Sequence, residues 1–455
     1  MKIIHVVNGF PPTAVAGVEQ YTHALARRQM ERHDVAIFCR ERAPDLAEYT
    51  VRDEVQEGLP VLRVVNNFHR ASGLETHYRN PDIEELFDAY LRETRPDVVH
   101  FQHCIGLSAG LPFVAGKLDI PFVLTLHDYW YICPTTRLLT RDMALCPGPH
   151  RGADCRRCLG SAAQISGLLH HLPLYAQVRD ALVPGEVQRK ALAWLERVQL
   201  PARPAGSSIP QPFVRRIRFM RRMLNTASRL LAPSDFCRQV YVDYGLRAEA
   251  IQVLSEGLEL DRWQRQPPRT SSPHLRFGYI GALAAHKGVD LLARAFRRLP
   301  DVDIELHLFG SGAPNDSFVA RLKEAAADDT RIQFRGRYEN ARLPELLAGI
   351  DVVVVPSRWH ETFSIVTREV LLAGLPVVAS RVGAIPNVIS DDVNGLLLPP
   401  SDEGALAEAM ARLAGDRSLV ARLAQAAKST SVKSAETHAL EIEAVYREIL
   451  DEVDG

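Results

Sequence analysis

The sequence lacks both a long hydrophobic run and an excess of charge of either sign. Its 455 residues carry 54 lysines and arginines against 55 aspartates and glutamates, which gives a formal net charge of −1. No overall field would therefore draw the chain to nucleic acid or to a membrane, and any basic patch must be local. No apolar stretch reaches the roughly 18 residues that predict a transmembrane helix. The apolar run before Asn8 is too short for a signal peptide, so we expect a cytoplasmic protein.

Cysteine is scarce, and four of the seven cysteines lie close together, at Cys133, Cys146, Cys155 and Cys158. An odd total with such a cluster argues against an extracellular disulfide framework and for a local site. The spacing, which ends in Cys-x2-Cys, suits a tetrahedral structural zinc. An iron–sulfur or redox site and unligated thiols are the alternatives. Four thiolates would leave no open position on a metal, so we expect a zinc knuckle that shapes the site without being catalytic.

The sequence also contains no Gly-x-Gly-x-x-Gly fingerprint, so the usual nicotinamide-type dinucleotide site is missing. Two other loops, 9–17 and 281–288, each follow an expected strand and open an expected helix. Gly281 and Gly288 permit a close approach of the backbone, and Lys287 offers a point charge for a phosphate. Alone this signal is weak, because a lysine at a helix start is usually solvated.

Apolar runs typical of buried strands alternate with helical patterns in two stretches, which begin at residue 2 and near residue 275. This alternation predicts parallel sheets covered on both faces. The segment 262–274 is rich in proline, serine and arginine and suits a linker. We therefore predict an α/β fold of two tandem Rossmann-like, doubly wound domains with an interdomain cleft. In such sheets ligands bind beyond the carboxyl ends of the strands.

The expected N-terminal domain covers residues 1–262, the expected C-terminal domain covers 263–432, and 433–455 should form a helix that packs back on the first domain. Residues 160–230 do not follow the alternation of strands and helices, and we interpret them as a helical, basic insertion. Within it, 213–231 places arginines beside apolar residues. This pattern fits either contact with anionic lipid headgroups or a lipid-pyrophosphate acceptor, or a solvated basic helix packed on the domain.

Two glutamates eight positions apart, Glu361 and Glu369, flank a predicted helix start. Ser364 is the expected N-cap, which places Glu361 in the loop and Glu369 early in the helix. The free amides from Phe363 to Val366 would form an anion site. A metalloprotease motif is excluded because serine occupies position 364, where the second histidine would stand. A glycosidase pair and two solvated glutamates remain alternatives.

Three histidines, His100, His103 and His127, fall at the expected carboxyl ends of strands in the first domain. A structural role is the alternative for each of them, and we favour His127 as the site residue.

Together these residues resemble the retaining GT-B glycosyltransferases of family four, the glycosyltransferase group 1 type. The resemblance covers nearly the whole chain except about 160–230. Its most specific element is the Glu-x7-Glu motif of Glu361 and Glu369, followed by "EVLLAGLPVVASRVGAIPNVI" and "NGLLLPP".

The resemblance implies a role for each matching residue. Glu361 would contact the hydroxyls of the donor sugar, and Glu369 would hold the nucleotide ribose. The amides of Phe363, Ser364 and Ile365 would bind the donor diphosphate, and Lys287 would neutralise the leaving phosphate. Four further matches are Gly17 and Gly281 in the two glycine loops, Arg335 where the base is received, and His127 as the active-site histidine.

Three positions depart from the family pattern. Ala16-Gly17 stands for Gly-Gly, and Glu256-Gly257 stands for Asn-Gly. Ala282 occupies the place of a second phosphate-binding arginine, for which Arg358 or Arg335 is the candidate replacement.

The implied activity is transfer of a sugar, with retention and without a catalytic metal, from a nucleotide-diphosphate sugar to a glycan, lipid-linked or small-molecule acceptor. The expected setting is glycan or glycoconjugate synthesis, with no nucleic-acid partner and with peripheral contact at the inner face of the membrane through 213–231. Catalysis would rest on positioning and on stabilisation of the departing phosphate by Lys287 and the helix-start amides. The alternatives are a same-fold sugar-nucleotide epimerase or glycogen-synthase-type enzyme, and a catalytically silent nucleotide-sugar-binding module.

Overall fold

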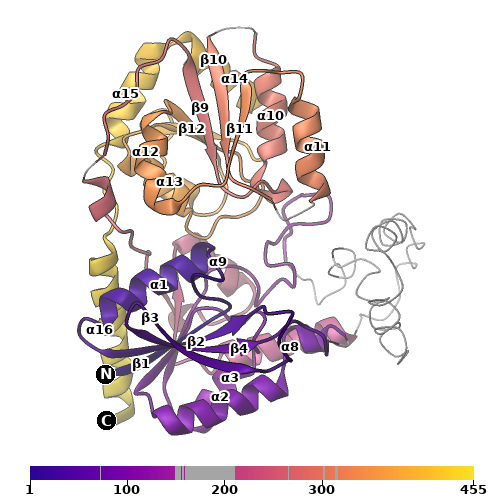
Figure 1. The fold of residues 1–455 in the computed structure, drawn as a ribbon, viewed down its shortest axis with the longest axis vertical. Coiled ribbons are helices and arrows are strands. Elements are labelled where there is room, and N and C mark those ends of the chain that lie inside the picture. The colour runs from indigo at the N-terminus through magenta and orange to yellow at the C-terminus, as the bar shows by residue number, and fades with distance from the viewer. Residues whose placement is uncertain are drawn as a thin grey trace.

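The computed structural model describes residues 1–71, 73–148, 155, 158, 211–264, 266–300, 303–312 and 316–454. These residues form two α/β domains, drawn one above the other in Figure 1. Most of the predicted insertion, residues 160–210, lies outside the described residues.

The N-terminal domain is built on a sheet with the strand order β3-β4-β2-β1-β5-β6-β7-β8. Its strands are β1 (Lys2–Val7), β2 (Asp34–Glu41), β3 (Val51–Gln56), β4 (Leu59–Val65), β5 (Val98–Phe101), β6 (Phe122–Thr125), β7 (Arg229–Ala232) and β8 (Ile251–Val253). The edge strand β3 pairs antiparallel with β4, and the remaining pairs are parallel. Because both faces of the parallel strands are covered, β1 and β5 are mainly apolar and are buried along nearly their whole length. The helices of this domain are α1 (Gly17–Gln29), α2 (Pro81–Thr94), α3 (Leu111–Lys117), α8 (Gln211–Leu224) and α9 (Asp235–Asp243).

The C-terminal domain is built on a parallel sheet with the order β11-β10-β9-β12-β13-β14. Its strands are β9 (Leu275–Ile280), β10 (Ile304–Phe309), β11 (Ile332–Gly336), β12 (Val352–Val355), β13 (Val377–Ser380) and β14 (Gly395–Leu398). Its helices are α10 (Val289–Arg297), α11 (Ser317–Ala326), α12 (Leu343–Ala348), α13 (Ile365–Leu372), α14 (Glu403–Gly415) and α15 (Arg417–Ala427). The order reverses between β9 and β12, which is the doubly wound arrangement. The predicted pair of Rossmann-like domains is confirmed.

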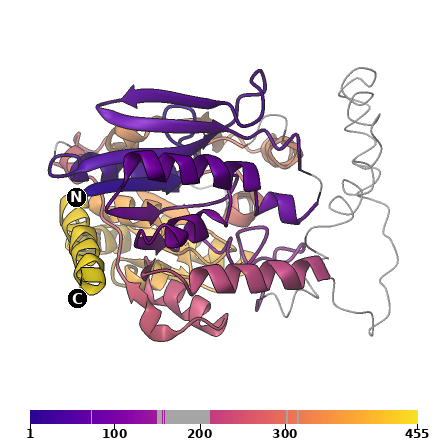
Figure 2. The same ribbon diagram turned by 90° about the horizontal axis from the view of Figure 1, so that it is seen from below.

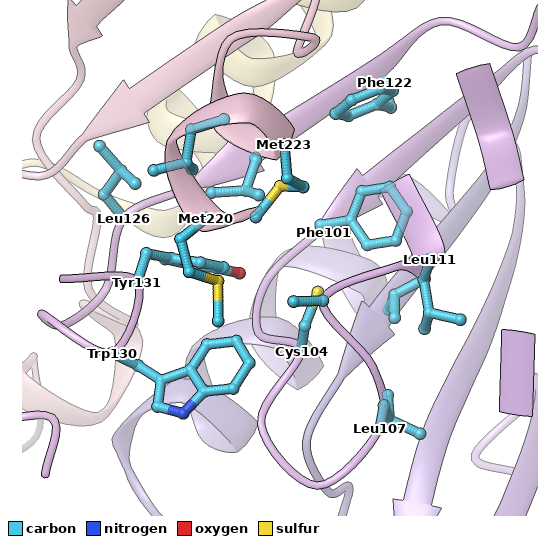
Figure 3. Close-up of a cluster of buried hydrophobic side chains, with 14 of the residues drawn as sticks. Phe101, Cys104, Leu107, Leu111, Phe122, Leu126, Trp130, Tyr131, Met220 and Met223 are labelled. Carbon is cyan, nitrogen blue, oxygen red and sulfur yellow. The ribbon is translucent and has the colours of Figure 1, made fainter. Parts of the chain in front are cut away.

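The helix α8 lies over the core of the N-terminal domain, with Met220 and Met223 buried in a cluster that includes Tyr131 and Cys104. Figure 3 shows Met220 beside Tyr131 in this cluster. The opposite face of α8 is exposed and carries four arginines, at positions 215, 218, 221 and 222. This arrangement is that of a basic helix packed on the domain, and its contact with lipid stays a prediction. The last residues of the predicted insertion belong to the sheet, since β7 begins at Arg229. In the described part of the chain, no helix has the length and apolar character needed to cross a membrane.

The last helix, α16 (Ala435–Asp454), returns to the N-terminal domain and packs against α1. It stands beside that domain as the yellow helix in Figure 1, and at its left edge in Figure 2. Tyr446 donates or accepts a 2.6 Å hydrogen bond at His100 Nδ1, while Ile442 and Ile449 are buried in the apolar cluster under β1. The chain therefore crosses between the domains twice, before β9 and again before α16.

A buried carboxylate fixes α16 to the N-terminal domain. Glu443 is fully buried, and its Oε1 lies 2.9 Å from Nη2 of Arg32, which follows α1. Removing the charge of one partner leaves the other partly unpaired, so Glu443→Gln should lower the free energy of unfolding by about 1–3 kcal/mol in a urea titration. Glu448→Gln, an exposed change on the same helix, should stay within about 0.5 kcal/mol of wild type. Equal losses in the two variants would contradict this role.

Candidate functional site

The two domains are in direct contact just before the start of α13. Thr362 Oγ1 donates a 2.6 Å hydrogen bond to the His127 carbonyl, and the Thr362 carbonyl accepts one of 2.7 Å from the Ser234 hydroxyl. On the N-terminal loop, a Cβ added to Gly17 would lie 3.9 Å from Cδ1 of Ile365. Each of these N-terminal residues follows the carboxyl end of a strand, as a ligand site in such a sheet requires.

Glu361, directly before Thr362, is buried and ionised. Its Oε1 accepts hydrogen bonds from Lys287 Nζ at 2.8 Å, from the Ser357 hydroxyl at 2.6 Å and from Trp359 Nε1 at 2.8 Å. Burial alone would raise the pKa of this carboxyl, but the Lys287 charge and these hydrogen bonds hold it below its usual range. All three donors meet Oε1, so Oε2 keeps its acceptor capacity for a ligand.

Lys287 reaches Glu361 from the loop after β9, where the backbone must bend sharply. Gly288 has φ +73°, and a Cβ there would lie 1.9 Å from the Pro356 carbonyl oxygen. Glycine is therefore required at this position for the loop to lie against the end of β12. The Lys287 ammonium also lies 4.9 Å from the centroid of the Trp359 ring. Lys287 and Glu361, 74 positions apart in the sequence, are thus in direct contact.

Glu369 is buried inside α13 and forms an ion pair with Arg262, in the short 3-10 turn Asp261–Trp263 that links the domains. Burial raises the pKa of Glu369 to about 7, and the Arg262 charge opposes that rise. Arg262 also donates to the Asn340 carbonyl at 3.1 Å. The partnership of Arg262 with Glu369 has no signal in the sequence, because it depends on where the linker passes the C-terminal domain.

The predicted N-cap position of Ser364 is correct, but its side chain does not cap the helix. Ser364 occupies the N-cap position, but its backbone is left-handed, with φ 61° and ψ 71°, and its side chain makes no cap hydrogen bond. Its hydroxyl instead contacts Thr367 Oγ1 at 2.6 Å. The amides at the start of α13 therefore keep their capacity to bind an anion.

His127 is engaged within the N-terminal domain. It is 8% exposed, its Nδ1 lies 3.0 Å from Glu256 Oε1, and its Nε2 lies 2.9 Å from Gln102 Oε1. Its backbone carbonyl accepts the hydrogen bond from Thr362. Its imidazole is bonded to Glu256 and Gln102 and makes no hydrogen bond to Glu361. Glu256, which departs from the family pattern, was not among the predicted site residues.

The other two predicted histidines are each hydrogen-bonded to neighbouring side chains. His100 is buried between Thr125 and Tyr446, and burial lowers its pKa well below the usual range, which fits a structural role. His103 contacts Asp128 at 3.2 Å.

Among the glycine and arginine candidates, Gly281 has φ +146° at the end of β9, and Arg335 is exposed on β11 and contacts His307. Arg358 is taken up by a two-pronged pair with Asp290, at 2.7 and 2.9 Å, so its charge is already balanced.

The four clustered cysteines line one cavity of about 360 Å³. Across the described residues, no group of three or more His, Cys, Asp or Glu side chains is placed to hold a metal ion. The predicted zinc knuckle gains no support from these residues and stays a prediction.

The opposite electrostatic settings of the two glutamates predict opposite pH behaviour. The folded protein holds a proton on Glu369 between its usual pKa of 4.5 and the folded value of about 7, so this residue lowers stability as pH rises through that window. The midpoint of thermal unfolding of Glu369→Gln should therefore rise relative to wild type between about pH 4.5 and about pH 7.

Glu361→Gln is the matched control for this titration. The pKa of Glu361 is depressed in the folded protein, so its ionised form contributes stability above pH 4.5 that is lost as pH falls through the folded value. The difference between Glu361→Gln and wild type should hence change in the acid range below 4.5. Identical pH profiles for the two variants would contradict the assignment.

Comparison with known proteins supports the two-domain division. Residues 15–155 match the family model described as Glycosyltransferase Family 4, and residues 274–416 match the one described as Glycosyl transferases group 1. The D-inositol 3-phosphate glycosyltransferase of Xylanimonas cellulosilytica is 30% identical over 204 residues, covering 41% of this chain and 48% of that protein. The protein of the same name from Mycobacterium tuberculosis is 28% identical over 260 residues, 54% of either chain. The chain thus spans about half the length of the curated relatives it matches.

Solved structures extend the likeness over the whole fold. Sucrose-phosphate synthase from Thermosynechococcus elongatus aligns with a TM-score of 0.67 at 18% identity, covering 99% of both chains. Anabaena HepE in complex with UDP-glucose aligns with a TM-score of 0.65 at 17% identity, covering 98% of this chain and 100% of that one. At such identities the likeness shows the fold alone. The chain therefore consists of a family 4 glycosyltransferase domain followed by a group 1 glycosyltransferase domain, arranged in the GT-B fold.

Proposed function

We propose that the protein is a retaining glycosyltransferase that moves a sugar from a nucleotide-diphosphate sugar to an acceptor hydroxyl without a catalytic metal. The observation that carries this proposal is the Lys287–Glu361 pair, which lies beside the uncapped start of α13 at the junction of the two domains. The fold neighbour HepE has been solved with UDP and with UDP-glucose, which supports a nucleotide-sugar donor.

The donor would lie along α13, with its diphosphate, its sugar and its nucleoside each bound by a different set of residues. Its diphosphate takes the amides of Phe363, Ser364 and Ile365, where the partial positive charge of the helix start favours an anion. Its sugar hydroxyls donate to the open Oε2 of Glu361. Its ribose hydroxyls donate to Glu369, and its base is received near Arg335 on β11.

The chemistry follows from where charge develops. When the bond between the sugar C1 and the phosphate oxygen breaks, negative charge grows on the departing diphosphate, and the Lys287 ammonium is at hand to stabilise it. That phosphate oxygen takes the proton of the acceptor hydroxyl as the acceptor oxygen bonds to C1. Because acceptor and leaving group share one face of the sugar, the configuration at C1 is retained.

The acceptor is a hydroxyl on a glycan, a lipid-linked sugar or a small polyol. The curated relatives bear the name D-inositol 3-phosphate glycosyltransferase, which supports a small phosphorylated polyol as the first acceptor to try. A catalytically silent binding module would bind the nucleotide sugar and transfer nothing.

The donor assignment is tested by a thermal-shift screen with UDP-, GDP- and ADP-sugars, followed by transfer assays with the sugar that stabilises the protein. Lys287→Ala should lower kcat by about 100- to 1,000-fold, because the leaving phosphate loses its cation. Glu361→Ala should abolish transfer. Circular dichroism should show that both variants stay folded. Lys323→Ala removes an exposed lysine of α11 in the same domain and should leave kcat unchanged. Full activity in Lys287→Ala, or no stabilisation of wild type by any of the donors, would refute the assignment.

Retention has its own measurement. Proton NMR of the product early in the reaction should show the anomeric configuration of the donor sugar. An inverted anomer would rule out the same-face mechanism while leaving glycosyl transfer intact.

A further inference from the structure

Arg368 is a buried arginine that belongs to none of the roles described so far. It lies in α13, directly before Glu369 in the sequence, and is 6% exposed. Its Nη1 donates to the Phe363 carbonyl, and its Cζ lies over the Phe363 ring at 3.7 Å from the centroid. The side chain thus points back toward the start of its own helix.

No carboxylate pairs with this guanidinium among the described residues. Burial lowers the pKa of Arg368 to about 10, against a smaller opposing effect of Glu256. Glu256 is itself engaged by His127 Nδ1 at 3.0 Å. Arg368 is therefore a cation at neutral pH that has been taken out of water without a counter-ion, which is costly unless an anion is supplied.

The contrast within the C-terminal domain is sharp. The other two buried arginines of its described residues each have an aspartate partner, Arg276 with Asp351 at 3.0 Å and Arg358 with Asp290 at 2.7 Å. A buried arginine in this domain is thus ordinarily neutralised by the protein. Arg368 is the exception, and it lies at the junction of the domains.

The position of Arg368 suggests which anion is missing. Its guanidinium touches Phe363, whose amide begins the row that would bind a diphosphate. Its Nε and Nη2 make no hydrogen bond to described residues, which leaves a planar fork of donors of the kind that binds phosphate oxygens in pairs. Lys287 alone brings one positive charge to the site, and Arg358 is already balanced by Asp290.

We propose that Arg368 is a second cationic ligand for the diphosphate of a nucleoside-diphosphate donor, acting together with Lys287 at the start of α13. The proposal rests on the proposed function, in which this helix start holds the donor diphosphate. In the free protein Arg368 is held by the Phe363 carbonyl and ring. The phosphate of the bound donor would act as the counter-ion that no described carboxylate provides.

Arg368→Met tests the proposal because it separates binding from stability. Affinity for UDP, GDP or ADP, whichever wild type binds, should fall about 10- to 100-fold in calorimetry, as expected for the loss of a charge-assisted hydrogen bond. Inorganic pyrophosphate, the phosphate-only probe, should lose its stabilising thermal shift. The midpoint of unfolding of the free variant should stay equal to wild type or rise, since an unpaired buried charge has been replaced by an apolar side chain. Arg368→Lys should recover part of the affinity.

Arg276→Met is the matched control. It also removes a buried arginine of the C-terminal domain, but one that is paired with Asp351, so it should lower the unfolding midpoint and leave nucleotide affinity unchanged. Unchanged affinity for the nucleoside diphosphate in Arg368→Met would overturn the proposal and leave the proposed function standing. Loss of nucleotide and pyrophosphate binding in Arg368→Met, combined with no sugar transfer by wild type from any donor, would support the phosphate site and refute the proposed function.

Discussion

The site depends on one contact between the domains, in which the hydroxyl and the carbonyl of Thr362 are both bonded to the N-terminal domain. These two bonds fix the backbone directly after Glu361 and three residues before Ile365, where α13 begins. The carboxylate of Glu361, the amides of α13 and the guanidinium of Arg368 all take their positions from this point. This contact therefore helps to set the residues that would face an acceptor relative to those that would hold a donor.

The charged groups around this segment are arranged as pairs that a ligand can rearrange. Lys287 holds Glu361, and Arg262 from the linker holds Glu369. In the proposed function, a diphosphate sugar would offer phosphate oxygens to the cations and hydroxyls to the carboxylates, and so would satisfy both members of each pair. Arg262 lies where the chain first crosses between the domains. A ligand bound at Glu369 would therefore act on a residue of the interdomain linker.

Much of this arrangement could be predicted from local sequence. The alternation of apolar runs and helical patterns predicts both sheets, and the placement of Glu361 before α13 and of Glu369 within it follows from the helix pattern alone. The contacts that sequence could not predict are those made across long separations. Arg262 meets Glu369, and Glu256 meets His127, because of how the domains and the linker dock. Ser364 fails as a side-chain cap because its backbone is left-handed, which no propensity indicates for serine. Arg368 looks like an ordinary exposed helix arginine in the sequence, but in the structure it is buried against Phe363.

The central claim is that the start of α13 binds the diphosphate of the donor, and a crystal structure of the protein with the nucleoside diphosphate that stabilises it tests this claim most directly. The account predicts phosphate oxygens at about 3 Å from the amides of residues 363–365 and from Lys287 Nζ, with Lys287 drawn from Glu361 toward the phosphate. A nucleotide bound elsewhere, with the Lys287–Glu361 pair intact and no phosphate at the start of α13, would contradict it.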